Sequence, residues 1–161
     1  MSYSNNLTGT AGEYFVCSEL SQRNILPLLT PKNNPLFDII ATNQDGSKYV
    51  AIQVKTMGHG NKQGWKLNKQ IQAYKNNPNL FLVLVNLNQD GDNEVYIYKY
   101  DNFVEKVNNT YLTYIDKPHH RTGKPKKEVN FRWYNFADFA SDDFERKNDW
   151  NIIMRALQSK I

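Results

Sequence analysis

Cysteine, histidine and long apolar runs are scarce in this chain of 161 residues. Its single cysteine, Cys17, excludes an internal disulfide and a zinc site built from several cysteines. The His119-His120 pair has no companion at metal-ligand spacing. No stretch approaches the roughly 20 apolar residues that cross a bilayer, and the first residues lack the features of a secretory signal. We therefore expect a protein of the cytoplasm that makes no use of a membrane.

The composition is that of a folded globule, with 40% hydrophobic and 13% aromatic residues. The length suits one domain spanning 1–161, large enough to bury a core. The net charge is +4 and the pI is about 9.0. This charge is compatible with a polyanionic partner without requiring one.

Residues 36–56 have the pattern of a β-hairpin. Asp45-Gly46 is a favoured centre for a two-residue turn, which makes the numbers of opposed residues sum to 91. One side of the hairpin is then apolar in every pair, namely Phe37 with Val54, Ile39 with Ile52 and Ala41 with Val50. The other side gathers Asp38, Gln53 and Lys55.

An acid, an amide and an amine on one hairpin face suit the hydrolysis of a phosphodiester. Asp38 and Gln53 offer oxygen ligands to a hard metal, and the Val54 carbonyl offers another. Lys55 can orient a water or stabilise developing negative charge. The alternative interpretation is an ordinary cross-strand ion pair between Asp38 and Lys55 on a solvated face.

Glu13 lies on the apolar stripe of a helix predicted from about residue 10 to residue 22. A carboxylate there is costly unless something pairs with it, so Glu13 is a further candidate metal ligand. Thr10 and Glu13 also match the S/T-x-x-E capping box, which gives Glu13 a structural role instead. Both readings remain open on the sequence.

The remaining pattern indicates one α/β domain with a mixed β-sheet flanked by helices. Residues 80–87 are continuously apolar, as in a central buried strand. A polar helix is expected over about 65–76 and an amphipathic helix near the C-terminus. The further expected strands lie at 25–30 and 94–100, and a short helix follows from 101 to 107.

Glu13 on the first helix, Asp38 in the second strand and Gln53-Val54-Lys55 in the third resemble the PD-(D/E)XK nuclease superfamily. The resemblance covers about residues 8–90, with 91–161 as a C-terminal elaboration, and implies a restriction-endonuclease-like core. It also implies that Asp38 is the metal-binding acid, Lys55 the motif lysine and Glu13 the helix glutamate of resolvase-like branches. The implied cofactor is Mg²⁺ or Mn²⁺.

The chain departs from the superfamily pattern at Gln53, where Asp or Glu is commonest. An amide keeps an oxygen ligand but lacks a unit of charge beside the metal, so it weakens metal affinity. Gln-x-Lys occurs in active branches, notably modification-dependent restriction enzymes and some homing endonucleases.

Basic residues suggest a surface for nucleic acid. The loop of residues 117–127 holds five Lys or Arg and no acid, and we call it the basic loop. Lys66 and Lys69 of the polar helix add to the charge. The candidate phosphate contacts are Lys66, Lys69, Arg121, Lys124, Lys126 and Lys127. A solvated surface explains these residues as well.

The sequence thus predicts a metal-dependent endonuclease that hydrolyses DNA, and a homodimer if both strands are cut. The alternative is a catalytically weakened or inactive scaffold that binds nucleic acid or protein. A small structural or inhibitory module with incidental charges is the third reading.

Overall fold

The computed structural model of the chain describes residues 5–32, 34–88 and 91–158. The α-helices of that part are α1 (Asn5–Ser21), α2 (Tyr100–Asp116), α3 (Ser141–Glu145) and α4 (Asn151–Leu157). Short 3-10 helices are η1 (Lys69–Gln72) and η2 (Phe136–Asp138). The strands are β1 (Leu26–Leu29), β2 (Ile39–Thr42), β3 (Tyr49–Thr56), β4 (Gly64–Asn68), β5 (Leu80–Asn86), β6 (Glu94–Lys99) and β7 (Phe131–Asn135).

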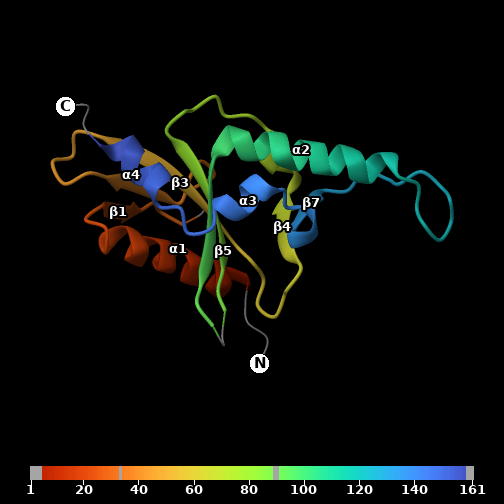
Figure 1. The fold of residues 1–161 in the computed structure, drawn as a ribbon, viewed down its shortest axis with the longest axis horizontal. Helices are drawn as coiled ribbons and strands as arrows, with labels where there is room; N and C mark the ends of the chain where they lie inside the picture. The colour runs from red at the N-terminus through yellow and green to blue at the C-terminus, as the bar shows by residue number, and fades with distance from the viewer. Residues whose placement is uncertain (1–4, 33, 89–90, 159–161) are drawn as a thin grey trace.

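Five strands form one mixed sheet in the order β1-β2-β3-β5-β6 (Figure 1). β3 and β5 run parallel, and the other neighbours are antiparallel. The predicted buried strand is confirmed, because β5 lies between two other strands and six of its seven residues are buried. β4 and β7 pair separately in a small antiparallel sheet.

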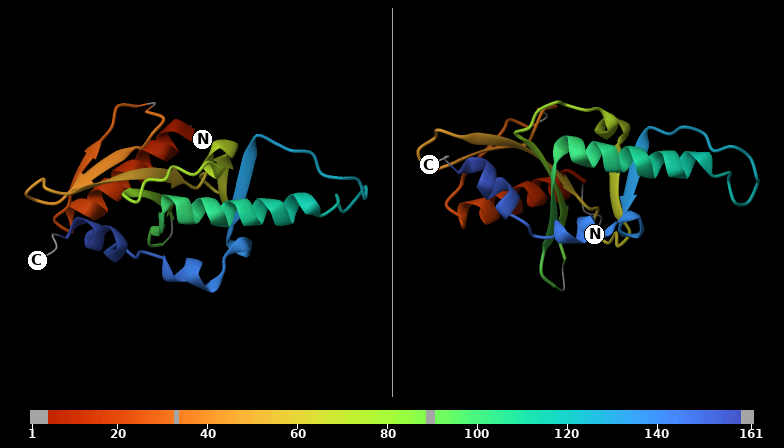
Figure 2. Two further views of the ribbon diagram at one scale, coloured as in Figure 1. Left: turned by 90° about the horizontal axis from the view of Figure 1, so that it is seen from above. Right: turned by 45° about the horizontal axis from the view of Figure 1, so that its top comes forward.

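Helices cover both faces of the five-stranded sheet (Figure 2). Val16 of α1 and Ile153 of α4 join one buried cluster with Ile39, Ile52 and neighbouring strand residues. On the other face, Phe103 of α2 and Trp65 of β4 join a second cluster with Leu82. The predicted fold class, a mixed sheet flanked by helices, is confirmed. Among the described residues no helix has the length and apolar character needed to cross a membrane.

The prediction of a helix over residues 65–76 is wrong. Residues 64–68 form β4, in which Trp65 and Leu67 are buried while Lys66 and Asn68 are exposed. This alternation is the period of a strand, and it arises from pairing with β7, which lies far along the chain. Non-local pairing overrides the helix propensity of Lys, Gln and Leu, and only the 3-10 turn η1 follows.

The helix predicted to end at residue 107 continues to Asp116. Asp101 does not cap this helix, α2, but lies in its first turn. Its two carboxylate oxygens accept hydrogen bonds from the backbone N–H groups of Lys75 (2.7 Å) and Asn76 (2.8 Å). α2 and the basic loop extend away from the large sheet, at the opposite end of the molecule from β1 (Figure 1).

Candidate active site

The predicted hairpin register is confirmed over its centre, where Ile39 pairs with Ile52 and Ala41 with Val50. The connection is longer than the two-residue turn expected at Asp45-Gly46. The last paired residues are Thr42 and Tyr49, and inside the loop the Gly46 N–H donates to the Asn43 carbonyl. Gly46 adopts φ +70°, which a glycine accepts without strain.

The hairpin departs from regular pairing at Asp38. The Asp38 N–H donates to the Ile52 carbonyl (2.9 Å), although Ile52 is already paired with Ile39. Two residues thus lie opposite one, which is the arrangement of a β-bulge. The predicted Phe37–Val54 pair is therefore wrong, because Phe37 packs on the opposite face of the sheet from Val54.

The bulge aims the Asp38 carboxylate at the backbone of β3. Its Oδ2 accepts a hydrogen bond from the Val54 N–H at 2.7 Å. Among the described residues nothing donates to Oδ1, which leaves that oxygen available to a ligand. Asp38 does not form a direct ion pair with Lys55 in the described part of the chain, so the cross-strand ion pair does not hold.

α1 brings Glu13 to this point because Gly12 allows the helix to approach β3 closely. A Cβ on Gly12 would lie 1.9 Å from Thr56 Oγ1, so only glycine fits between the two elements. The capping-box reading of Glu13 is wrong. α1 begins at Asn5, which puts Thr10 inside the helix, and the Thr10 hydroxyl instead accepts a hydrogen bond from Lys32 Nζ (2.6 Å).

The charge of Asp38 acts on the Glu13 carboxylate. Partial burial raises the pKa of Glu13, and the charge of Asp38 raises it further, while Lys32 and Lys55 oppose the rise. Burial also raises the pKa of Asp38, against the effects of the Val54 N–H and Lys55. An acid whose ionisation is disfavoured by burial and by a neighbouring carboxylate is stabilised in its charged form by a nearby cation. Lys32 is the residue near the site that the sequence did not single out.

The donor set fits one hard divalent cation. Asp38 and Glu13 supply two carboxylates, and the half-buried Gln53 amide makes no hydrogen bond within the described residues. The Val54 carbonyl belongs to the same stretch of backbone that holds Asp38. No group of three or more His, Cys, Asp or Glu that could hold a metal occurs among the described residues. The site is therefore limited to two charged ligands.

No protein-family model and no curated protein matches this chain. Among solved structures, a bacterial homing endonuclease, I-Ssp6803I, superposes with a TM-score of 0.57 at 12% identity, over 95% of this chain and 95% of that one. This chain has a restriction-endonuclease-like fold, a mixed sheet flanked by helices. A Holliday junction resolvase from the archaeon Archaeoglobus fulgidus superposes with a TM-score of 0.45 at 15% identity, over 81% of this chain and 86% of that one.

The resemblance drawn from the sequence is thus confirmed at the level of this nuclease fold. The roles of Glu13, Asp38, Gln53 and Lys55 stay predictions, since similarity at 12% identity describes the fold alone.

The basic residues predicted to contact nucleic acid lie in β4, in η1 and in the basic loop. Lys66 lies over the Phe131 ring at 4.3 Å, and Lys69 forms an ion pair with Glu128 at 3.0 Å. Lys126 lies over the Tyr114 ring at 3.8 Å. The other three, Arg121, Lys124 and Lys127, are exposed in the basic loop.

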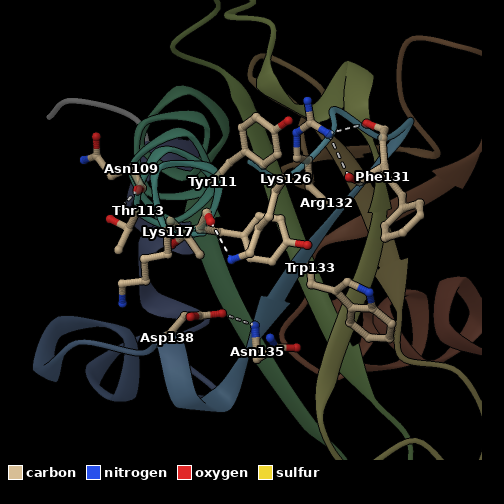
Figure 3. Close-up of a pocket in the computed structure, with 13 residues that line it drawn as sticks. Asn109, Tyr111, Thr113, Lys117, Lys126, Phe131, Arg132, Trp133, Asn135 and Asp138 are labelled. Carbon is tan, nitrogen blue, oxygen red and sulfur yellow. Dashed lines mark hydrogen bonds between the residues drawn. The ribbon is translucent and has the colours of Figure 1, made fainter. Parts of the chain in front are cut away.

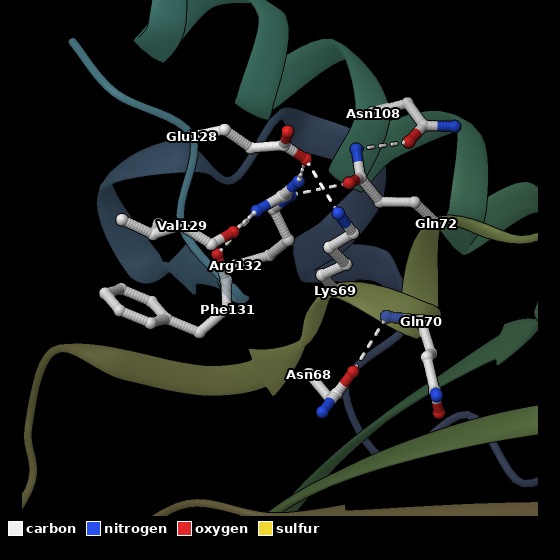
Figure 4. A network of polar contacts seen from close by, with 9 residues as sticks. All are labelled: Asn68, Lys69, Gln70, Gln72, Asn108, Glu128, Val129, Phe131 and Arg132. Carbon is white, nitrogen blue, oxygen red and sulfur yellow. Dashed lines mark hydrogen bonds and ion pairs between the residues drawn. The ribbon is translucent and has the colours of Figure 1, made fainter.

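A second group of polar contacts, missed in the sequence, fixes the base of the basic loop (Figure 4). Arg132 is buried at 3% exposure and donates to the carbonyls of Val129 (2.6 Å) and Phe131 (2.8 Å) and to Gln72 Oε1 (2.5 Å). The Arg132-Trp133-Tyr134 run of charge and aromatics was its only signal in the sequence.

Proposed function

We propose that the chain is a metal-dependent endonuclease that hydrolyses phosphodiester bonds in DNA. Asp38 and Glu13 would hold Mg²⁺ or Mn²⁺, with the Val54 carbonyl and Gln53 as neutral ligands. The bound cation would polarise the scissile phosphate and neutralise its charge. Lys55 would orient the attacking water and stabilise the negative charge that develops on the phosphorus oxygens.

The observation that carries this proposal is the bulge at Asp38. It takes a carboxylate out of the regular ladder and fastens one of its oxygens to Val54 N–H, within the electrostatic reach of Glu13 and Lys55. A carboxylate held in this way needs little reorganisation to bind a cation. The nuclease fold of the chain supports the proposal.

DNA is the proposed substrate because exposed cationic side chains lie in the basic loop and on the neighbouring strand β4. Lys66, Lys124 and Lys127 are exposed and can contact phosphates without reading sequence. The described residues hold one such candidate site per chain, so a homodimer would place two sites on the two strands.

The test is cleavage of labelled linear, nicked and four-way-junction DNA in Mg²⁺, Mn²⁺ or EDTA. Wild type should cut only with metal. Asp38→Asn and Lys55→Ala should each lose roughly 100-fold or more in rate while keeping their affinity for DNA in Ca²⁺. Lys48→Ala, directly before the start of β3, is the matched control. Binding without cleavage on every substrate would contradict the proposal and leave a binding module.

A further inference from the structure

A cleft of about 730 Å³ opens between the C-terminal half of α2 and β7, at the base of the basic loop (Figure 3). We call it the α2–β7 cleft. Tyr111, Tyr114 and Trp133 line it, and none of the three belongs to either buried cluster of the protein. Aromatic rings at the wall of a solvent-open cleft offer flat surfaces on which another ring can stack.

The two tyrosine rings are held in place by cations. The Arg132 guanidinium carbon lies 3.5 Å from the centroid of the Tyr111 ring, and Lys126 Nζ lies 3.8 Å from that of Tyr114. Lys126 Nζ also donates to the Tyr114 carbonyl at 2.7 Å. The buried hydrogen bonds of Arg132 anchor this arrangement to β7 (Figure 4). The wall of the cleft is therefore pre-organised, which lowers the entropic cost of binding.

Trp133 differs from the other two tryptophans of the chain. Trp65 is 1% exposed and donates its Nε1–H to the Val85 carbonyl at 3.1 Å, and Trp150 is 4% exposed. Trp133 is partly exposed, and among the described residues its indole makes no hydrogen bond and stacks on no aromatic ring. Its ring is open to a ligand.

The charge around the cleft selects an anionic ligand. Lys117 and Lys126 lie in its lining, and the adjoining basic loop contains no acid. The one carboxylate of the lining, on Asp138, accepts a hydrogen bond from the Asn135 N–H at 2.9 Å. Flat aromatic rings beside cations match a nucleotide, whose base stacks and whose phosphates pair with lysine.

We propose that the α2–β7 cleft binds an unpaired nucleobase of a DNA strand, stacked on Trp133, with the flanking phosphates on Lys117 and Lys126. A base within a duplex is stacked between its neighbours and cannot enter a cleft without leaving the helix. The inference rests on DNA as the proposed substrate, and it adds a preference for DNA that contains unpaired nucleotides.

The test measures binding in EDTA, so that no cleavage occurs. Fluorescence anisotropy would compare labelled oligothymidylate of about 12 nucleotides, a blunt duplex and a duplex with one unpaired thymine. Trp133→Ala should weaken binding of the single strand and the bulged duplex about 10-fold or more and leave the blunt duplex unchanged. Trp133→Phe keeps a stacking ring and should stay within about threefold of wild type. Tyr49→Ala, an exposed tyrosine at the start of β3, should change nothing.

Tryptophan fluorescence gives a second readout, because Trp65 and Trp150 are buried and Trp133 is not. Oligothymidylate should quench the emission, and the blunt duplex should not. An equal loss of affinity for all three DNAs in Trp133→Ala, or no loss for any, would overturn the inference. If free thymidine monophosphate saturated the cleft at the same concentration as the oligonucleotide, the claim that the bound base belongs to a DNA strand would be rejected.

The outcome is separable from that of the proposed nuclease function. Cleavage that depends on Asp38 and Lys55, together with DNA affinity that ignores Trp133, would reject the cleft alone. Binding of unpaired bases at Trp133 with no cleavage on any substrate would reject the nuclease alone.

Discussion

Asp38 is a residue whose position costs stability when no cation is bound. Burial raises the pKa of its carboxyl, so the folded protein binds a proton there more tightly than the unfolded chain does. By linkage, the metal-free protein is stabilised at this site at low pH and loses that stabilisation as the pH rises through the raised pKa. Functional carboxylates are often placed at such a cost to folding.

We therefore expect Asp38→Asn to raise the melting temperature in EDTA near neutral pH. The amide oxygen can still accept the Val54 N–H, so the hydrogen bond is kept while the buried charge is removed. Added Mg²⁺ at about 100 times its Kd should stabilise wild type by roughly 3 kcal/mol and the variant by much less. Calorimetry between about pH 5 and 8 would measure this. A lower melting temperature for the variant throughout that range would contradict the expectation.

Asp143 is a buried acid with a purely structural environment. Its Oδ1 accepts hydrogen bonds from the hydroxyls of Tyr98 (2.8 Å) and Tyr134 (3.1 Å). Its Oδ2 accepts from the Ala140 N–H (2.8 Å) and pairs with Lys106 Nζ (3.1 Å). Burial, with the charge of Asp143, raises the pKa of both tyrosines, so they stay protonated donors.

Asp143→Ala should lower the free energy of unfolding by roughly 3–5 kcal/mol, because it leaves the two hydroxyls and part of the Lys106 charge without their acceptor. Its neighbour Asp142 also pairs with Lys106, at 2.8 Å, but is 47% exposed. Asp142→Ala is the matched control and should cost at most about 1 kcal/mol. Urea denaturation would measure both. Equal losses in the two variants would show that burial does not set the energy of this network.

At the scale of elements, the crossing of α1 over β3 determines where Glu13 lies. Gly12 permits the crossing because any larger residue would meet Thr56. Gly9, one turn earlier in the same helix, has nothing within 4 Å of the position of a Cβ. The two glycines thus differ in their surroundings but not in their secondary structure.

Gly12→Ala should lower the free energy of unfolding by about 1–3 kcal/mol, because the added methyl group would push α1 away from β3. Gly9→Ala should leave stability unchanged or raise it by up to about 1 kcal/mol, since alanine favours the helix. If Glu13 serves the site, Gly12→Ala should also reduce metal-dependent cleavage. Thermal melts and cleavage rates of the two variants would decide this. The expectation fails if Gly12→Ala behaves like Gly9→Ala in both measurements.

The same elements show what the sequence could predict. Alternation of apolar residues sufficed for the Ile39–Ile52 register and for the buried β5, because burial acts on each residue directly. The bulge at Asp38 was not predictable, since it depends on the Ile52 carbonyl accepting from two successive positions. The strand β4 is not predicted because its partner β7 lies beyond β5, β6, α2 and the basic loop. The sequence identifies Glu13 as a candidate ligand but leaves its capping role open. That role is excluded only by the start of α1 at Asn5, which the sequence does not predict.

At the scale of the whole molecule, the basic loop lies at the opposite end from β1. It carries five positive charges and no negative one. A protein that neutralises phosphates loses affinity as salt rises, with a slope of about 0.9 per contact on duplex DNA. The exposed side chains of Arg121, Lys124 and Lys127 are free of ion pairs in the described part of the chain.

Replacing these three residues by alanine should reduce the slope of log affinity against log salt by up to about 3. Lys147→Ala is the control for the loss of a lysine outside the basic loop, because Lys147 is paired with Glu94 at 2.6 Å. Anisotropy titrations with duplex DNA at several salt concentrations would measure the slopes. An unchanged slope in the triple variant would remove the basic loop from the DNA surface.

The pairing of β4 with β7 has a consequence for how the chain folds. The β2–β3 and β5–β6 hairpins join segments close in sequence, whereas β4 must wait for a strand that follows α2 and the basic loop. Because closing long loops slows folding, the hairpin that carries Asp38 and Lys55 is expected to form before the β4–β7 sheet. Hydrogen-exchange labelling during refolding should therefore protect the Val54 N–H earlier than the N–H of Tyr134, which pairs with Trp65 across the β4–β7 sheet. The candidate active site would then be in place before the surface around Trp133 is complete.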